Sequence, residues 1–348
     1  MSTSESPHIF VFEATEDERD AAGDLAGNLR DLGIAAPFVI ASAHGLKLAS
    51  ELGSTDSAVI PPPGSNKHYA TALGSRVRRA GADAVVAVGG GRVLDVAKLA
   101  AARAGLTVVV APTQLSHDGI CSPVAVVPDE LGLTQSLAAI APRVVYLSMP
   151  TLVNAPLDSV RAGLGDLLAN PLALRDWALA ADRGLATIDQ SSWDLSASSF
   201  EMVQDYVARE IETVAGDPLF LRRLADALVL SGMSMIRSGT SRPASGGEHE
   251  ISHAIDALYG GRALHGAQVA FGCIFSLALY GEDVAAFRRQ LQLVGLPHHP
   301  QQLGLSIEDT VAVLLGAPET RPGRFTVIED ADLDEAQALK LVQRIWGE

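Results

Sequence analysis

Short apolar runs rich in Val and Ile alternate, in the first part of the chain, with longer segments whose apolar residues recur at helical spacing. The runs predict strands over His8–Phe12, Phe38–Ala41, Ala58–Ile60, Asp83–Val88 and Thr107–Ala111. The segments between them predict helices over Asp17–Leu32, Leu46–Leu52, Lys67–Arg79 and Val93–Arg103. This alternation predicts an α/β domain with a mainly parallel sheet, helices on both of its faces and ligands at the carboxyl ends of its strands.

The pattern changes near residue 150. Just before it, alternating runs predict a hairpin from Val124–Val127 and Ser136–Ile140, and Arg143–Ser148 predicts one more strand. After it, periodic Leu, Ala, Val and Ile predict helix after helix. We therefore expect a Rossmann-like α/β domain over residues 1–150 and an all-helical domain over residues 151–348.

Three consecutive glycines, Gly89, Gly90 and Gly91, follow the strand predicted over Asp83–Val88. A strand, a glycine turn and a helix in this order present free backbone N–H groups at a helix N-terminus, where glycine lets a phosphate approach. The spacing differs from the G-x-G-x-x-G of dinucleotide-binding loops, and a plain tight turn has the same appearance. We interpret this segment as a candidate phosphate or dinucleotide cradle.

Composition narrows the class of protein. A chain of 348 residues with 48% hydrophobic side chains can bury a large core. The net charge of −15 argues against nucleic acid or an anionic membrane as a partner, since both require a basic surface. Cys121 and Cys273 lie far apart, which excludes a disulfide scaffold. No leader-like segment and no apolar run of about 18 residues is present, so we expect a soluble, cytoplasmic protein.

Polar residues in the second part of the chain carry candidate chemistry. Asp166 lies in GLGDLLA, His249 and His253 in GGEHEISHA, and His265 in LHGAQV. His249 and His253 share a helix face because they are one turn apart. A carboxylate and imidazoles from separate helices suit Zn²⁺ or a similar divalent metal and leave a position open for substrate. Without an HExxH signature, a helix-capping Asp166 and hydrogen-bonded histidines are the alternative.

Together the motifs resemble the glycerol-1-phosphate dehydrogenases, a branch of the superfamily that holds glycerol dehydrogenase, iron-containing alcohol dehydrogenases and dehydroquinate synthase. The similarity lies in GGGRVLDVAK, PTQLSHDGICSP, GLGDLLA followed by RDW, SRPASGGEHEISHAID and LHGAQVAFG. RPGRFTVIED resembles the family's terminal RxRYT-type motif. The resemblance covers essentially the whole chain. It implies a dehydroquinate synthase-like fold and an NAD(P)-dependent, metal-containing alcohol dehydrogenase.

The resemblance also implies which residues bind the cofactor, NAD or NADP. Those that would surround its pyrophosphate are Gly89, Gly90, Gly91 and Asp95. Those that would line the nicotinamide half of the site are Thr113, Ser116 and Ser122.

The resemblance also implies which residues bind the substrate and the metal. Asp118 would contact the substrate hydroxyls. Asp166, His253 and His265 would hold one Zn²⁺ per chain, with His249 beside it as an orienting residue or proton carrier. The implied reaction is the reduction of a hydroxyketone, free or phosphorylated, with zinc as the Lewis acid and the reduced nicotinamide as the hydride donor.

The segment after the metal aspartate departs from the family pattern. Asn170 stands where the family has a lysine, and Leu172 where it has a tyrosine. A lost charge-assisted hydrogen bond costs roughly 1.5–3 kcal/mol, so the departure predicts a substrate other than dihydroxyacetone phosphate. Arg175 and Arg242 are candidate replacement cations.

Two other classes of function stay open. One is a metal- and NAD-dependent carbocycle-forming lyase similar to dehydroquinate synthase. The family pattern of those enzymes has a glutamate followed by a lysine at the position where this chain has Asp166. The other is a non-catalytic nucleotide-binding descendant, against which the retained Asp118, His253 and His265 argue. The resemblance further implies a homo-oligomer.

Overall fold

The computed structural model describes residues 6–13, 18–52, 58–130 and 132–347. A parallel five-stranded sheet forms the first part of the chain, with strand order β1-β7-β4-β3-β2. Its strands are β1 (His8–Phe12), β2 (Pro37–Ala41), β3 (Ala84–Gly89), β4 (Thr107–Pro112) and β7 (Val144–Ser148). The predicted strands of this sheet are therefore confirmed, except that Ala58–Ile60 makes only an isolated bridge from Val59 to Ile40.

Helices cover both faces of this sheet, as the alternating pattern predicts. They are α1 (Glu18–Asp31), α2 (Lys67–Arg79) and α3 (Gly91–Ala104). Alternate residues of β3 face opposite sides: Val86 packs in the same cluster as Leu25 of α1, and Val85 in the cluster that holds Leu73 of α2. Residue 17 of the predicted first helix lies outside the described residues.

The helix predicted over Leu46–Leu52 is wrong. Residues 43–51 form consecutive turns instead. Gly45 lies so close to β3 that a Cβ there would be 2.3 Å from the Val88 carbonyl oxygen. The chain is thus pressed against the strand end, and so short a segment cannot form a stable helix on its own.

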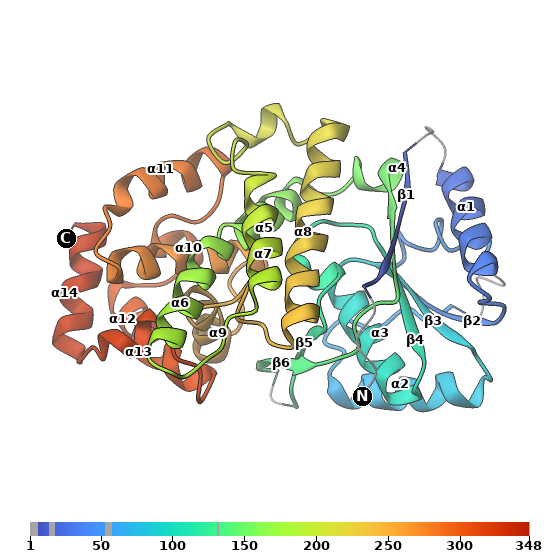
Figure 1. Ribbon diagram of the computed structural model, residues 1–348, viewed down its shortest axis with the longest axis horizontal. Coiled ribbons are helices and arrows are strands. Elements are labelled where there is room, and N and C mark those ends of the chain that lie inside the picture. Colours follow the sequence, from blue (N-terminus) through green and yellow to red (C-terminus); the bar gives the residue numbers. More distant parts are fainter. Residues whose placement is uncertain (1–5, 14–17, 53–57, 131, 348) are drawn as a thin grey trace.

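A two-stranded antiparallel hairpin, β5 (Val124–Pro128) with β6 (Thr134–Ala138), interrupts the α/β pattern and confirms the predicted hairpin. In Figure 1 it lies between the sheet and the helical part of the chain.

All elements described after Ser148 are helical, as predicted (Figure 1). The α-helices are α4 (Met149–Leu152), α5 (Leu157–Leu167), α6 (Asn170–Asp182), α7 (Gln190–Glu201), α8 (Pro218–Ser238), α9 (Gly247–Tyr259), α10 (His265–Leu279), α11 (Val284–Val294), α12 (Ile307–Gly316), α13 (Val327–Ala331) and α14 (Glu335–Trp346). The 3₁₀ helices are η2 (Asp118–Ile120), η3 (Ile211–Thr213), η4 (Pro300–Leu303) and η5 (Ala317–Thr320). Among the described residues, no helix is long and apolar enough to cross a membrane.

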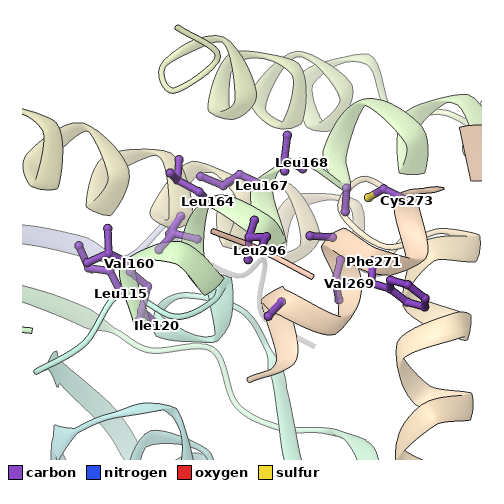
Figure 2. Close-up of a cluster of buried hydrophobic side chains, with 14 of the residues drawn as sticks. Leu115, Ile120, Val160, Leu164, Leu167, Leu168, Val269, Phe271, Cys273 and Leu296 are labelled. Atoms are coloured by element: carbon purple, nitrogen blue, oxygen red, sulfur yellow. The ribbon is translucent and has the colours of Figure 1, made fainter. Parts of the chain in front are cut away.

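One hydrophobic cluster runs from the sheet into the helical part. Figure 2 shows Leu115 and Ile120, from the loop after β4, beside Val160 and Leu164 of α5, with Phe271 of α10 further along. The two parts share this buried core, so the loop after β4 is held against the helices. The division into two domains at residue 150 stays a prediction.

A buried lysine fixes the same loop to the sheet domain. Lys98 of α3 is fully buried, its Nζ lies 2.9 Å from Asp95 Oδ1, and it donates hydrogen bonds to the carbonyl oxygens of Gly119 and Val124. Asp95 Oδ2 in turn accepts from the Val126 N–H at 3.1 Å. A buried charge is tolerated only when it is paired in this way.

We expect Lys98→Met to lower the free energy of unfolding by roughly 3–5 kcal/mol, because it leaves the Asp95 carboxylate buried without its partner. The double variant Asp95→Asn/Lys98→Met should recover part of this loss. Urea denaturation measures both, with Lys67→Met at an exposed position as the control. A loss no larger than that of the control would contradict the assignment.

Candidate active site

The glycine turn lies at the floor of a large cleft. β3 ends at Gly89, and α3 begins at Gly91 with Gly90 as its N-cap, which makes no side-chain capping bond. The first N–H groups of α3 therefore lack partners within the helix and can bind an anion. A Cβ at Gly91 would lie 2.3 Å from His117 Nε2, and one at Gly90 would lie 2.9 Å from Gln114 Oε1. A side chain at either position would require His117 or Gln114 to shift.

The cleft has a volume of about 1260 Å³, enough for a dinucleotide. Four predicted cofactor residues line it: Gly90, Gly91, Thr113 and Ser116. Gly89 closes β3 beneath them. The residues present therefore fit a phosphate-bearing cofactor at the N-terminus of α3.

Two predicted cofactor residues lie elsewhere. Asp95 is buried against Lys98 and does not line the cleft; with Ser122 it lines a smaller cavity on the far side of His117. In the structure Asp95 supports the loop through Lys98 and the Val126 N–H, and its role at the pyrophosphate stays a prediction. The DVAK pattern could have revealed the pairing with Lys98, because Asp95 and Lys98 are one helical turn apart.

Three helices bring a carboxylate and two imidazoles together beside the cleft. Asp166 of α5, His249 of α9 and His265 of α10 each offer one ligand atom, and these atoms all lie within 4.8 Å of one another. Asp166 Oδ1 is 3.7 Å from His249 Nε2 and 3.9 Å from His265 Nε2. His265 also lines the cleft, so this metal-ligand cluster lies next to the cofactor site.

The electrostatics of the cluster suit a divalent metal. Burial lowers the pKa of His249 and His265 well below the ordinary value, so both imidazoles are neutral and offer lone pairs. Burial and the neighbouring Asp118 raise the pKa of Asp166. A cation bound here would stabilise the Asp166 carboxylate, and one oxygen with two nitrogens is a typical zinc donor set.

His253 is not part of this cluster. Its Nε2 accepts a hydrogen bond from Arg321 Nη2 at 3.3 Å and lies 3.4 Å from Ser136 Oγ. Its ring centroid is 6.1 Å from that of His265. The predicted metal set contained His253, with His249 as the neighbour; that set stays a prediction, and the geometry of the cluster favours His249 as the third ligand.

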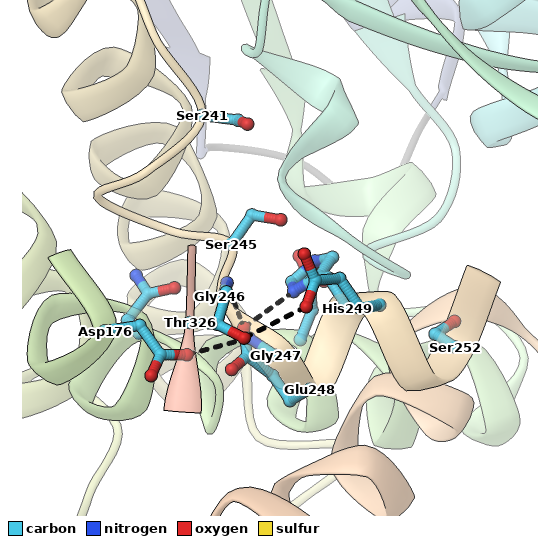
Figure 3. Close-up of polar contacts among 12 residues, drawn as sticks. Asp176, Ser241, Ser245, Gly246, Gly247, Glu248, His249, Ser252 and Thr326 are labelled. Atoms are coloured by element: carbon cyan, nitrogen blue, oxygen red, sulfur yellow. Dashed lines mark hydrogen bonds and ion pairs between the residues drawn. The ribbon is translucent and has the colours of Figure 1, made fainter. Parts of the chain in front are cut away.

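Glu248 orients His249, a role that sequence reasoning missed. Its Oε1 accepts from the Gly246 N–H at 2.6 Å and lies 3.0 Å from His249 Nδ1 (Figure 3). A carboxylate on the outer nitrogen of a metal-binding histidine fixes the ring so that the other nitrogen faces the metal. The signal in the sequence is an acid directly before the histidine, which alone is too common to identify the role.

Asp118 borders the cluster, as predicted for a substrate-binding residue. Its N–H donates to Asp166 Oδ2 at 2.8 Å, and its Oδ2 accepts from Ser231 Oγ at 2.9 Å. Burial raises the pKa of Asp118 to about 6, against the effect of the Ser231 hydrogen bond. It lines the smaller cavity together with His249.

The segment around Asn170, which departs from the family pattern, lines neither the cleft nor the smaller cavity. Asn170 is buried and donates to Ser199 Oγ at 2.7 Å and to Ser231 Oγ at 3.1 Å, so it supports Asp118 through Ser231. Neither Asn170 nor Leu172 lines the cleft or the smaller cavity. The residues that depart from the family pattern therefore act on these spaces only indirectly, through the support that Asn170 gives Asp118 by way of Ser231.

The candidate replacement cations do not reach the site either. Arg175 pairs with Glu282 and stacks on Tyr280, with its guanidinium carbon 3.9 Å from the ring centroid. Arg242 donates to the Phe325 carbonyl oxygen at 3.2 Å. Neither lines the cleft or the smaller cavity.

A second opening reaches the cluster from the side opposite the cleft. The smaller cavity contacts His249, His253 and His265, and it shares His253, Ser136 and Arg321 with a large pocket of about 1580 Å³ beside the β5–β6 hairpin. The cluster therefore lies between a cofactor-sized cleft and a separate pocket.

Asp176 holds the start of α9, which carries His249. Its Oδ2 accepts from the Gly247 N–H at 2.8 Å (Figure 3). Its Oδ1 accepts from the Val327 N–H at 2.9 Å and from Tyr280 Oη at 2.6 Å. One carboxylate thus joins α6 to the beginnings of α9 and α13.

Comparisons with known proteins agree with this geometry. Residues 19–156 match the family described as iron-containing alcohol dehydrogenase. The glycerol-1-phosphate dehydrogenase [NAD(P)+] of Cenarchaeum symbiosum is 36% identical over 75% of this chain and 72% of its own length. That of Sulfurisphaera tokodaii is 36% identical over 80% and 77%. A solved structure of a probable glycerol dehydrogenase from Sinorhizobium meliloti has the same fold, with a TM-score of 0.77 and 23% identity over 97% of this chain and 96% of that one.

The pH dependence of stability should reflect Asp176. Burial and the nearby Glu248 raise the pKa of Asp176 to about 7. Because the unfolded carboxyl releases its proton at a lower pH, near 4, ionisation favours the unfolded chain between about pH 4 and pH 7. Relative to Asp176→Asn, the wild type should therefore lose up to about 4 kcal/mol of unfolding free energy over this range.

Urea denaturation at several pH values measures this difference. The matched control is Asp182→Asn, at an exposed position of the same helix. If the free energy of unfolding changed with pH in the same way for the wild type and for Asp176→Asn, the raised pKa of Asp176 would be contradicted.

Proposed function

The chain belongs to the glycerol-1-phosphate dehydrogenase family, and we propose that it reduces a hydroxyketone phosphate to the alcohol with NADH or NADPH. It is an NAD(P)-dependent, metal-containing alcohol dehydrogenase. The observation that carries the proposal is the position of the metal-ligand cluster, whose His265 lines the same cleft as the open glycine turn. This arrangement supports a Lewis-acid site beside a dinucleotide site.

Each part of the site has a task in this reaction. A divalent cation held by Asp166, His249 and His265 supplies Lewis-acid polarisation of a ketone oxygen, and the nicotinamide supplies the hydride. The free N–H groups at Gly90 and Gly91 bind the pyrophosphate. Asp118 accepts a hydrogen bond from a substrate hydroxyl, since its carboxylate lines the cavity next to His249. Glu248 keeps the His249 ring in orientation.

The reductase is favoured over the lyase alternative. The curated relatives described above are named glycerol-1-phosphate dehydrogenase, and they cover most of this chain. The buried segment around Asn170 does not line the substrate spaces, which supports a substrate similar to theirs. Assembly into a homo-oligomer and a cytoplasmic location remain predictions, and sedimentation of the purified protein tests the first.

Turnover tests the proposal directly. Zinc-loaded protein should oxidise NADH or NADPH in the presence of dihydroxyacetone phosphate, measured by absorbance. Asp166→Asn should reduce kcat by at least about a hundredfold, because it removes the charged metal ligand. Exposed Asp182→Asn serves as the control. Zinc-bound, cofactor-bound protein that reduces neither this ketone nor its unphosphorylated form would overturn the proposal.

Metal content tests the ligand set independently of turnover. We expect His249→Ala to purify without stoichiometric zinc and His253→Ala to retain it, because only His249 lies with Asp166 and His265. Inductively coupled plasma mass spectrometry measures this. Retention by His249→Ala together with loss by His253→Ala would instead support the set that the sequence resemblance implies.

A further inference from the structure

Two arginines converge on one short loop near the metal-ligand cluster. Arg321 donates from Nη1 to Ser245 Oγ, and Arg324 donates from Nη1 to the Ser245 carbonyl oxygen at 2.9 Å. Arg324 also donates from Nη2 to Ser241 Oγ. Both side chains are half-buried and come from the segment between η5 and α13. Figure 3 shows Ser241 and Ser245 on the segment that leads into α9.

Neither guanidinium has a carboxylate partner. Among the described residues, no carboxylate oxygen lies within 4.0 Å of Arg321 or Arg324. By contrast, Arg161, Arg175 and Arg222 each pair with an acid. Burial together with the neighbouring Arg321 lowers the pKa of Arg324 to about 10, and Glu250 and Glu248 oppose this shift. Because neither glutamate is within ion-pair distance, the two adjacent guanidinium groups favour a directly bound anion.

Both groups face the space from which a substrate reaches the cluster. Arg321 lines the smaller cavity with His249 and His265, and Arg321 and Arg324 both line the large pocket beside the hairpin. Arg321 also donates to His253, which lies one helical turn from His249. The guanidinium of Arg321 is thus separated from a metal-ligating histidine by a single side chain.

We propose that Arg321 and Arg324 bind the phosphate of the substrate while its ketone end lies at Asp166, His249 and His265. This inference rests on the proposed function and names the residues that recognise the substrate charge. A phosphate monoester has the charge and the acceptor oxygens to replace the serine contacts of both guanidinium groups. The anion site lies outside the cleft that holds the glycine turn, so it does not serve a phosphate on the cofactor.

Kinetics with paired substrates test this assignment. Arg321→Gln should lower kcat/KM for dihydroxyacetone phosphate by roughly 10- to 100-fold, and change it for dihydroxyacetone by less than about threefold. The kcat/KM of Arg321→Lys for dihydroxyacetone phosphate should lie between those of the wild type and Arg321→Gln, because a lysine keeps the charge but lacks the paired N–H donors of a guanidinium group. The ratio of NADPH to NADH turnover should not change. Equal losses for both ketones would overturn the inference.

A binding measurement separates this inference from the proposed function. Isothermal titration of the zinc-loaded protein with inorganic phosphate should show a site that Arg321→Gln and Arg324→Gln each weaken by roughly 10-fold or more. Arg289→Gln, at an exposed position, is the matched control. Unchanged phosphate affinity in both variants would refute the site. If the wild type reduced neither ketone, the proposed function would fail while this titration still decided the anion site.

Discussion

The candidate site depends on direct backbone contact between α5 and α10. A Cβ at Gly266 would lie 1.9 Å from the Ala162 carbonyl oxygen, and one at Gly165 would lie 2.4 Å from the Gly266 carbonyl oxygen. These glycines are the immediate neighbours of His265 and Asp166. Any side chain at either position would push the helices apart, and the ligand atoms of the cluster would separate with them. Gly272 of α10 makes a similar contact with α9.

Buried charged groups then set the positions of the loops around the cluster. Lys98 holds the loop that carries Asp118, and Asp176 holds the first turn of α9. Each of these groups exchanges hydrogen bonds with water for hydrogen bonds with backbone atoms from distant segments. Such contacts contribute little to stability beyond what burial costs, but they allow only one arrangement of the loops. The site is therefore preorganised by polar residues that do not touch the cleft.

The residues that we propose for substrate recognition and for metal binding come from different segments of the chain. The residues that depart from the family pattern, Asn170 and Leu172, are buried in α6 behind Asp118. The unpaired Arg321 and Arg324 come from more than a hundred residues later in the chain. A change in one segment can thus leave the chemistry and the charge preference of the site intact. The departure of Asn170 from a lysine alters the support of Asp118 through Ser231 rather than the walls of the substrate space.

Local patterns in the sequence were enough to predict the alternating strands and helices, the hairpin, the helical second part and the glycine turn, because period and turn chemistry act over a few residues. They also identified the acids and histidines of the cluster. The sequence could not separate His249 from His253, since both lie on one face of α9; in the tertiary structure, packing against α5 and α10 brings His249 to Asp166 and His265. The same holds for Asp95, Asn170 and Arg321, whose surroundings come from distant segments that no local pattern encodes.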